Sequence, residues 1–257
     1  MWKRIAMISA SVLLAALWAL PLVAQHHPHQ QNAEDLKIQQ AVNQELSKHT
    51  YSKDVQATVD DHIATLGGSV DCYRDKLRAG RAIRHTPGLE GTRNEIVVGG
   101  KPIADDVLRE KIAAKLRTDR VGQGNTFNSF TLEVRNGVVT LGGEARTDTD
   151  RDSALAIVQD TCGVKDVVSQ VKVLPTSIFD DRIRASVARA IYSDPVLQKY
   201  AIDPQQPIRI VVDHGHVTLT GSVNNAMDSQ VAEIRAKEVP GVFSVTNKLF
   251  VPGKEVR

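Results

Sequence analysis

The run Asp148-Thr-Asp-Arg-Asp152 places three carboxylates at alternate positions, as the first half of a calcium-binding loop does. Such a loop also needs glycine at its sixth position and glutamate at its twelfth, where this chain has Ser153 and Gln159. Acidic residues at the start of a helix explain the run better, because they favour the positive end of the helix dipole. We therefore expect no calcium site here.

The histidines are the second group that could bind a metal. The run His26-His27-Pro28-His29 could chelate copper or nickel if the mature chain begins at Gln25, using the terminal amine and the third-position imidazole. An N-terminal glutamine tends to cyclise and lose its amine, so a disordered polar linker is the better interpretation. His214 and His216 flank Gly215 and are expected to be solvated turn residues. The sequence predicts no metal site and no other cofactor.

Catalytic constellations are absent from the sequence. It contains no serine–histidine–aspartate grouping, nucleophile elbow, phosphate loop or zinc spacing. The acidic pairs fall in predicted turns or first helical turns, at Asp60-Asp61, Asp105-Asp106 and Asp180-Asp181. We therefore expect a protein that is not an enzyme.

A basic helix is the first candidate binding surface. Arg74, Arg78 and Arg81 follow helical spacing and are expected to share a face, which could contact phosphate head groups. Asp71 and Asp75 dilute this charge, and an ordinary solvated helix is the alternative.

An aromatic segment is the second candidate. Tyr192, Leu197 and Tyr200 lie around Pro195, just after a predicted helix. Aromatic and aliphatic side chains in such a loop could enter a membrane interface. Alternatively, they cap the core or pack against the preceding part of the chain, which we slightly favour.

The N-terminus has the pattern of a secretory signal. Lys3 and Arg4 precede an uncharged apolar stretch that ends at Ala24, so we predict a signal peptide over residues 1–24 and a polar linker over 25–32. An uncleaved membrane anchor is the alternative. Without the leader, 30 basic residues face 30 acidic ones, so no overall positive field attracts nucleic acid. The expected location is periplasmic or secreted.

A threefold repeat sets the architecture. Anchor glycines at Gly68, Gly143 and Gly221 are each followed twenty residues later by a second glycine, at Gly88, Gly163 and Gly241. A leucine stands two residues before each anchor and an alanine eleven residues after it. The period of 75 and then 78 residues is too long for a solenoid repeat and predicts three small domains in tandem.

Each copy reads as helix, strand, strand, helix, strand. In each copy, three apolar residues spaced four apart form one stripe and predict the first helix. The stripes are Ile38, Val42 and Leu46; Leu108, Ile112 and Leu116; and Ile183, Val187 and Ile191. A hairpin and a helical crossover then build a three-stranded mixed sheet covered by two helices, an α+β unit. The expected domains cover residues 33–99, 103–174 and 177–252, with a tail at 253–257. The second glycine of each copy is expected to end the second helix.

The two cysteines lie at opposite ends of the second helix in different copies. Export would permit a disulfide between Cys72 and Cys162, but only if these ends meet across the contact between two domains. We favour two free thiols, with the disulfide as the alternative.

The pattern resembles the BON domain, a module of bacterial envelope proteins that often occurs in tandem. The resemblance is carried by "IVVDHGHVTLTGSV" and "VPGVFSVTNKLFV" in the third copy, by "VRNGVVTLGGEA" in the second and by "ATLGGSV" in the first. It implies a non-enzymatic protein that binds phospholipid surfaces or another envelope component, including proteins, in envelope maintenance or stress. The alternative is a chaperone-like periplasmic protein that binds unfolded polypeptides without lipid contact. The shared motifs are core and turn positions, so the resemblance transfers no binding residues.

Overall fold

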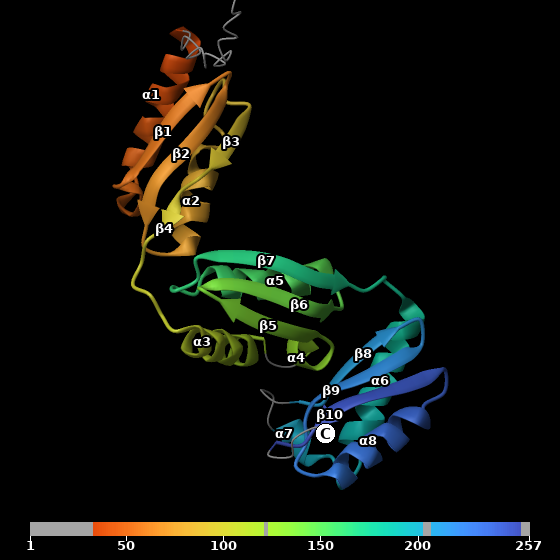
Figure 1. Ribbon diagram of the computed structural model, residues 1–257. Helices are drawn as coiled ribbons and strands as arrows, with labels where there is room; N and C mark the ends of the chain where they lie inside the picture. Colours follow the sequence, from red (N-terminus) through yellow and green to blue (C-terminus); the bar gives the residue numbers. More distant parts are fainter. Residues whose placement is uncertain (1–32, 121–122, 203–206, 253–257) are drawn as a thin grey trace, which may run out of the picture.

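The chain forms three α+β units in a row, as the repeat predicts (Figure 1). We describe a computed structural model over residues 33–120, 123–202 and 207–252. The predicted signal peptide, linker and C-terminal tail lie outside these residues. Within them, no helix has the length and apolarity that crossing a membrane requires.

The same order of elements recurs in each unit. The first unit contains α1 (Ala33–Ser47), the short 3₁₀ helix η1 (Thr50–Ser52), β1 (Val55–Asp60), β2 (Ile63–Val70), α2 (Tyr73–Ile83), β3 (Gly91–Asn94) and β4 (Val97–Val98). The second contains α3 (Asp105–Thr118), α4 (Gln123–Thr126), β5 (Ser129–Arg135), β6 (Val138–Ala145), α5 (Asp148–Gln159) and β7 (Asp166–Val173). The third contains α6 (Ile178–Tyr192), α7 (Lys199–Ile202), β8 (Arg209–Asp213), β9 (His216–Ser222), α8 (Ala226–Lys237) and β10 (Ser244–Phe250).

The second strand is central in every sheet. It pairs antiparallel with the strand before it, as in β5 with β6, and parallel with the strand that follows the crossover helix, as in β6 with β7. The first unit differs because its last strand is broken into β3 and β4. The two long helices of each unit lie on one face of its sheet (Figure 1).

The predicted helix stripes form the core. All nine residues of the three stripes are buried, from Ile38 in α1 to Ile191 in α6. Burial of such side chains is the main favourable contribution to folding, about 1.5–3 kcal/mol for each large apolar residue. The buried residues of the first and second units form one continuous cluster, and the third unit has its own, against which Phe127 of the second unit packs.

The anchor glycines have equivalent surroundings in all three units. Their φ angles are +101°, +94° and +121°, a region that side-chain-bearing residues rarely adopt. A Cβ atom on Gly68 or Gly143 would lie 2.0 Å from the carbonyl oxygen of the residue that precedes or begins the first strand. On Gly221 the corresponding oxygen, that of Pro207 two residues before β8, would be 3.0 Å away. Glycine is therefore required by the path of the backbone.

The second glycines do not cap the second helices, contrary to expectation. The helices end at Ile83, Gln159 and Lys237, four or five residues before Gly88, Gly163 and Gly241. These glycines have φ values of +83°, +107° and +90° in the turn that leads to the last strand. The left-handed conformation is thus as expected, but it reverses the chain after the helix has already ended.

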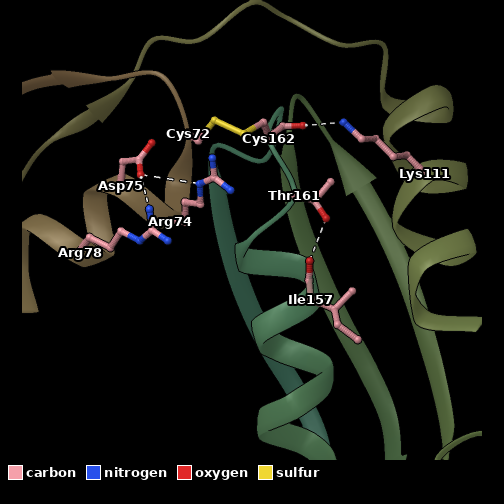
Figure 2. The surroundings of a disulfide bond; sticks show 8 residues. All are labelled: Cys72, Arg74, Asp75, Arg78, Lys111, Ile157, Thr161 and Cys162. Carbon is pink, nitrogen blue, oxygen red and sulfur yellow. Dashed lines mark hydrogen bonds and ion pairs between the residues drawn. A yellow bond between two sulfur atoms is a disulfide. The ribbon is translucent and has the colours of Figure 1, made fainter. Parts of the chain in front are cut away.

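A disulfide joins the first unit to the second (Figure 2). Cys72 precedes the first residue of α2, Cys162 lies in the turn after α5, and their Cα atoms are 4.9 Å apart. The prediction that Cys72 and Cys162 are free thiols is therefore wrong. The two helix ends meet at the contact between the units, where burial, followed by the negative charge of Asp166, raises the pKa of Tyr73.

Polar contacts join the second unit to the third. Lys172 of β7 pairs with Asp213 of β8 at 2.8 Å, and Arg146 pairs with Asp181 of α6 at 3.1 Å. The hydroxyls of Ser129 and Thr220 are 3.1 Å apart. Each unit therefore contacts the next unit along the chain.

Candidate functional site

The three arginines that were predicted to share one face of α2 have different interaction partners. Arg74 and Arg78 both approach the carboxylate of Asp75, at 3.7 and 3.4 Å (Figure 2). Arg81 is exposed and its Nε donates to the carbonyl of Leu77 at 3.4 Å. Asp75 thus offsets the charge of two of the three arginines.

Arg81 instead lines a groove next to Arg84. This groove, of about 590 Å³, lies between α2 and β3, and Gln159 of the second unit contributes to its wall. Glu90 also lines it, so its charge is mixed.

The predicted aromatic segment lies in the core of the third unit. Leu197 is fully buried, and Tyr192 donates a hydrogen bond to the carbonyl of Ile208 at 2.6 Å. Tyr200 is 8% exposed and donates to the carboxylate of Asp228 at 2.6 Å. Burial raises the pKa of Tyr200 to about 12. The segment therefore packs in the protein core and does not form an exposed membrane-binding loop, because both tyrosine hydroxyls have hydrogen-bond partners inside the protein.

A different apolar surface is exposed at one end of the third unit. Ile178 and Phe179 begin α6, and Phe243 lies in the turn before β10. Their exposed fractions are 71%, 75% and 77%. We call these three residues the apolar tip. Large exposed apolar patches often mark sites of interaction with a membrane or another protein.

A groove of about 500 Å³ lies beside the apolar tip, lined by Phe179 and Phe243. Ser177, Asp180, Arg182, Ile183, Ser186, His214, Gly215, Pro240 and Gly241 complete its wall. Arg182 is exposed, and it forms no ion pair with the residues that the structure describes. A phospholipid interface offers both an apolar layer and anionic head groups. Apolar side chains next to an exposed cation are suited to bind both.

The backbone around the apolar tip is held in place. Asp180, the residue after Phe179, accepts hydrogen bonds from the backbone N–H groups of His214 and Gly215 at 3.1 and 2.8 Å. The backbone N–H of Phe243 donates to the carbonyl of Gly215 at 2.9 Å. The start of α6, the hairpin turn and the segment before β10 therefore form one connected structure.

The other units show that the fold does not require this aromatic pair. The position of Phe179 is occupied by Glu34 in the first unit and Ala104 in the second. The position of Phe243 is occupied by Glu90 and Lys165, counted from the second glycine. In the first unit both carboxylates lie within 4 Å of His62, in the equivalent turn. Single-residue patterns do not reveal the apolar tip, but aligning the three copies would have.

The described residues contain no group of three histidine, cysteine or acidic side chains placed to hold a metal ion. The Asp148 run starts α5, and its carboxylates at 148, 150 and 152 pair with Arg151 and Arg120. The histidine run at 26–29 lies outside the described residues.

Three comparisons place the chain among known proteins. A family model described as "BON domain" matches residues 34–100, 104–175 and 179–253. A relative from Anaplasma centrale, described as "Uncharacterized protein in gshII 5'region", is 25% identical over 142 residues, which cover 54% of this chain and 94% of the relative.

Two solved structures were also found as matches to this chain. The C-terminal domain of CdsD, a structural protein of the type III secretion system of Chlamydia trachomatis, is 12% identical with a TM-score of 0.24, covering 82% of this chain and 96% of that one. The periplasmic domain of the inner membrane protein PrgH from S. typhimurium is 12% identical with a TM-score of 0.21, covering 80% and 96%. We draw no functional argument from scores this low.

Proposed function

This chain belongs to the BON-domain family, and we propose that it is a non-enzymatic envelope protein whose third unit docks on a phospholipid surface through the apolar tip. The observation that carries the proposal is that Phe179 and Phe243 are both exposed and line one groove, at positions where the first unit has carboxylates. The signal peptide expected at residues 1–24 would bring such a surface to the cell envelope.

The energetics favour a weak, reversible contact. Full burial of one such side chain is worth about 1.5–3 kcal/mol, so partial insertion of three gives a few kcal/mol. Arg182 adds attraction to anionic head groups of about 1 kcal/mol at low salt. The exposed Arg81 and Arg84 of the first unit form a secondary basic surface in this proposal, with Arg78 contributing less because it shares Asp75 with Arg74.

Co-sedimentation with anionic vesicles at low salt tests the proposal, using the chain from Gln25 onward. We expect the wild type to bind and the double variant Phe179→Ser/Phe243→Ser to bind at least about tenfold more weakly, from the apolar area removed. Met227→Ser/Ile234→Ser is the matched control, because it also removes two apolar residues of α8 that are 66% and 53% exposed. Absence of vesicle binding by the wild type, or equal losses in the two double variants, would contradict the proposal.

Binding of unfolded polypeptides is the second candidate, because the groove beside the apolar tip could hold an apolar side chain. It predicts that the protein suppresses aggregation of a denatured client while showing no affinity for vesicles. A client assay run beside the co-sedimentation therefore separates the two functions.

A further inference from the structure

A cavity of about 150 Å³ lies at the contact between the second and third units. Its wall comes from α3, the segment around α4, β5 and the first residue of β8: Ala113, Leu116, Arg117, Gly124, Asn125, Asn128, Phe130, Leu132 and Arg209. It lies away from the apolar tip and shares no lining residue with the groove beside it.

Two arginines line this cavity, one from each unit. Arg117 lies in the last turn of α3, and Arg209 begins β8. Burial, followed by the positive charge of Arg117, lowers the pKa of Arg209. Within residues 33–120, 123–202 and 207–252, no acidic side chain lines the cavity and neither arginine forms an ion pair.

Arg120, Asn125 and Asn128, which lie near the two arginines, have interactions of their own. Arg120 stacks over Phe130 and is itself paired with Asp150 at 3.0 Å. The amide groups of Asn125 and Asn128 donate to the carbonyls of Arg117 and Gly124, at 2.8 and 3.0 Å. Two like charges that are partly removed from water are unfavourable unless an anion accompanies them.

The size and chemistry of the cavity select the kind of anion. A space of this size holds a few waters or one small anion. Guanidinium groups bind phosphate-type oxygens through paired N–H donors. We propose that this cavity binds a small tetrahedral oxyanion of the phosphate class between Arg117 and Arg209. Because each unit supplies one arginine, the bound anion would tie the second unit to the third.

Calorimetric titration with inorganic phosphate, together with thermal unfolding, tests the site. We expect saturable binding to the wild type, and an unfolding midpoint that rises by about 3–6 °C for each tenfold increase in phosphate above Kd. Chloride at the same ionic strength should not reproduce the rise. No saturable phosphate binding, or an equal effect of chloride, would overturn the proposal.

Variants separate the site from general charge effects. Arg117→Gln and Arg209→Gln should each weaken phosphate binding at least tenfold. In phosphate-free buffer neither should lower the unfolding midpoint, since each removes a like-charge repulsion. Arg109→Gln is the matched control, because it removes an exposed arginine from the same helix two turns away and should bind phosphate like the wild type. Should Arg117→Gln fail to fold, Arg117→Lys keeps the charge and loses the paired donors, and the same weakening is expected.

A lipid head group could supply the same oxyanion, so soluble short-chain phosphatidylglycerol forms a second arm. A response to this lipid that requires Phe179 and not Arg117, without any response to inorganic phosphate, would overturn the cavity proposal and leave the vesicle-docking function intact.

Discussion

Asp105 accepts hydrogen bonds from the backbone N–H groups of both Asn136 and Gly137, at 2.6 and 2.9 Å, and so ties the first turn of α3 to the hairpin between β5 and β6. Asp180 makes the same pair of contacts in the third unit, and Asp35 accepts from the N–H of His62 in the first. The turn residues have positive φ in all three units, as in type I′ turns. One aspartate in each copy therefore links the first helix to the hairpin.

Replacing Asp105 with alanine tests this link. Two backbone N–H groups would lose a charged acceptor, so we expect the free energy of unfolding to fall by about 2 kcal/mol. Asp106→Ala is the control, because Asp106 is exposed in the same helical turn and shares any interaction with the helix dipole. Equal losses in denaturant unfolding of the two variants would show that the helix dipole, and not the hairpin contact, explains why an aspartate recurs at this position in the three copies.

Gly68 offers a second test of the shared backbone path. Its φ is +101°, and an added Cβ would lie 2.0 Å from the carbonyl oxygen of Asp54. We expect Gly68→Ala to cost about 2 kcal/mol or more in unfolding free energy. The neighbouring Gly67 has open space around it, so Gly67→Ala should change stability by less than about 1 kcal/mol. A neutral effect at Gly68 in thermal unfolding would show that the anchor position does not need glycine.

The disulfide should stabilise the contact between the first and second units. It closes a chain segment of 90 residues, and such a bond contributes about 2–4 kcal/mol. We expect a reductant to lower the unfolding midpoint of the wild type and to have no effect on Cys72→Ser/Cys162→Ser. Amide hydrogen exchange in the third unit should not change. A wild-type midpoint that is insensitive to complete reduction would contradict a stabilising role.

Acidification should weaken the contact between the second and third units. The hydrogen bond from Lys172 lowers the pKa of Asp213 below its usual value, with His214 contributing after it. The stabilisation is therefore complete above the unfolded-state pKa, near 4, and is lost as the pH falls through the lower folded-state value. Because the Lys172 side chain is 58% exposed, solvent screens this ion pair and we expect its contribution to be small.

Urea unfolding at pH 6 and pH 3 measures the contribution of the Lys172–Asp213 ion pair to the free energy of unfolding. Asp213→Asn should lose less stability than the wild type on acidification, whereas Asp106→Asn, an exposed acid of the second unit, should behave like the wild type. A wild-type pH dependence in Asp213→Asn would exclude this ion pair as its source.

The sequence predicts the parts of this structure that local pattern determines. Residues such as Ile112 and Val187 recur every helical turn, and Asn136-Gly137 marks a hairpin, so helices, turns and the mixed sheet follow from spacing and backbone preference. The family resemblance through the anchor glycines is confirmed by the family model over all three units.

What the sequence did not predict depends on how distant segments meet. The bond between Cys72 and Cys162 requires two helix ends, 90 residues apart, to face each other. The burial of Tyr200 depends on the placement of Asp228 from the next helix. The apolar tip combines Phe179 and Phe243, which look like ordinary core candidates until the structure shows that both lie outside the core.

Tryptophan fluorescence at position 179 tests the central claim most directly. The two tryptophans of the sequence are Trp2 and Trp18, so a chain that starts at Gln25 has none and Phe179→Trp reports on the apolar tip alone. Phe250→Trp, at a 51% exposed site away from the tip, is the reference. We expect anionic vesicles to shift the emission of Phe179→Trp to shorter wavelength, and lipids brominated near the head group to quench it, with no change in the reference. An unchanged emission at position 179 under saturating lipid, or equal changes at both positions, would contradict docking through the apolar tip.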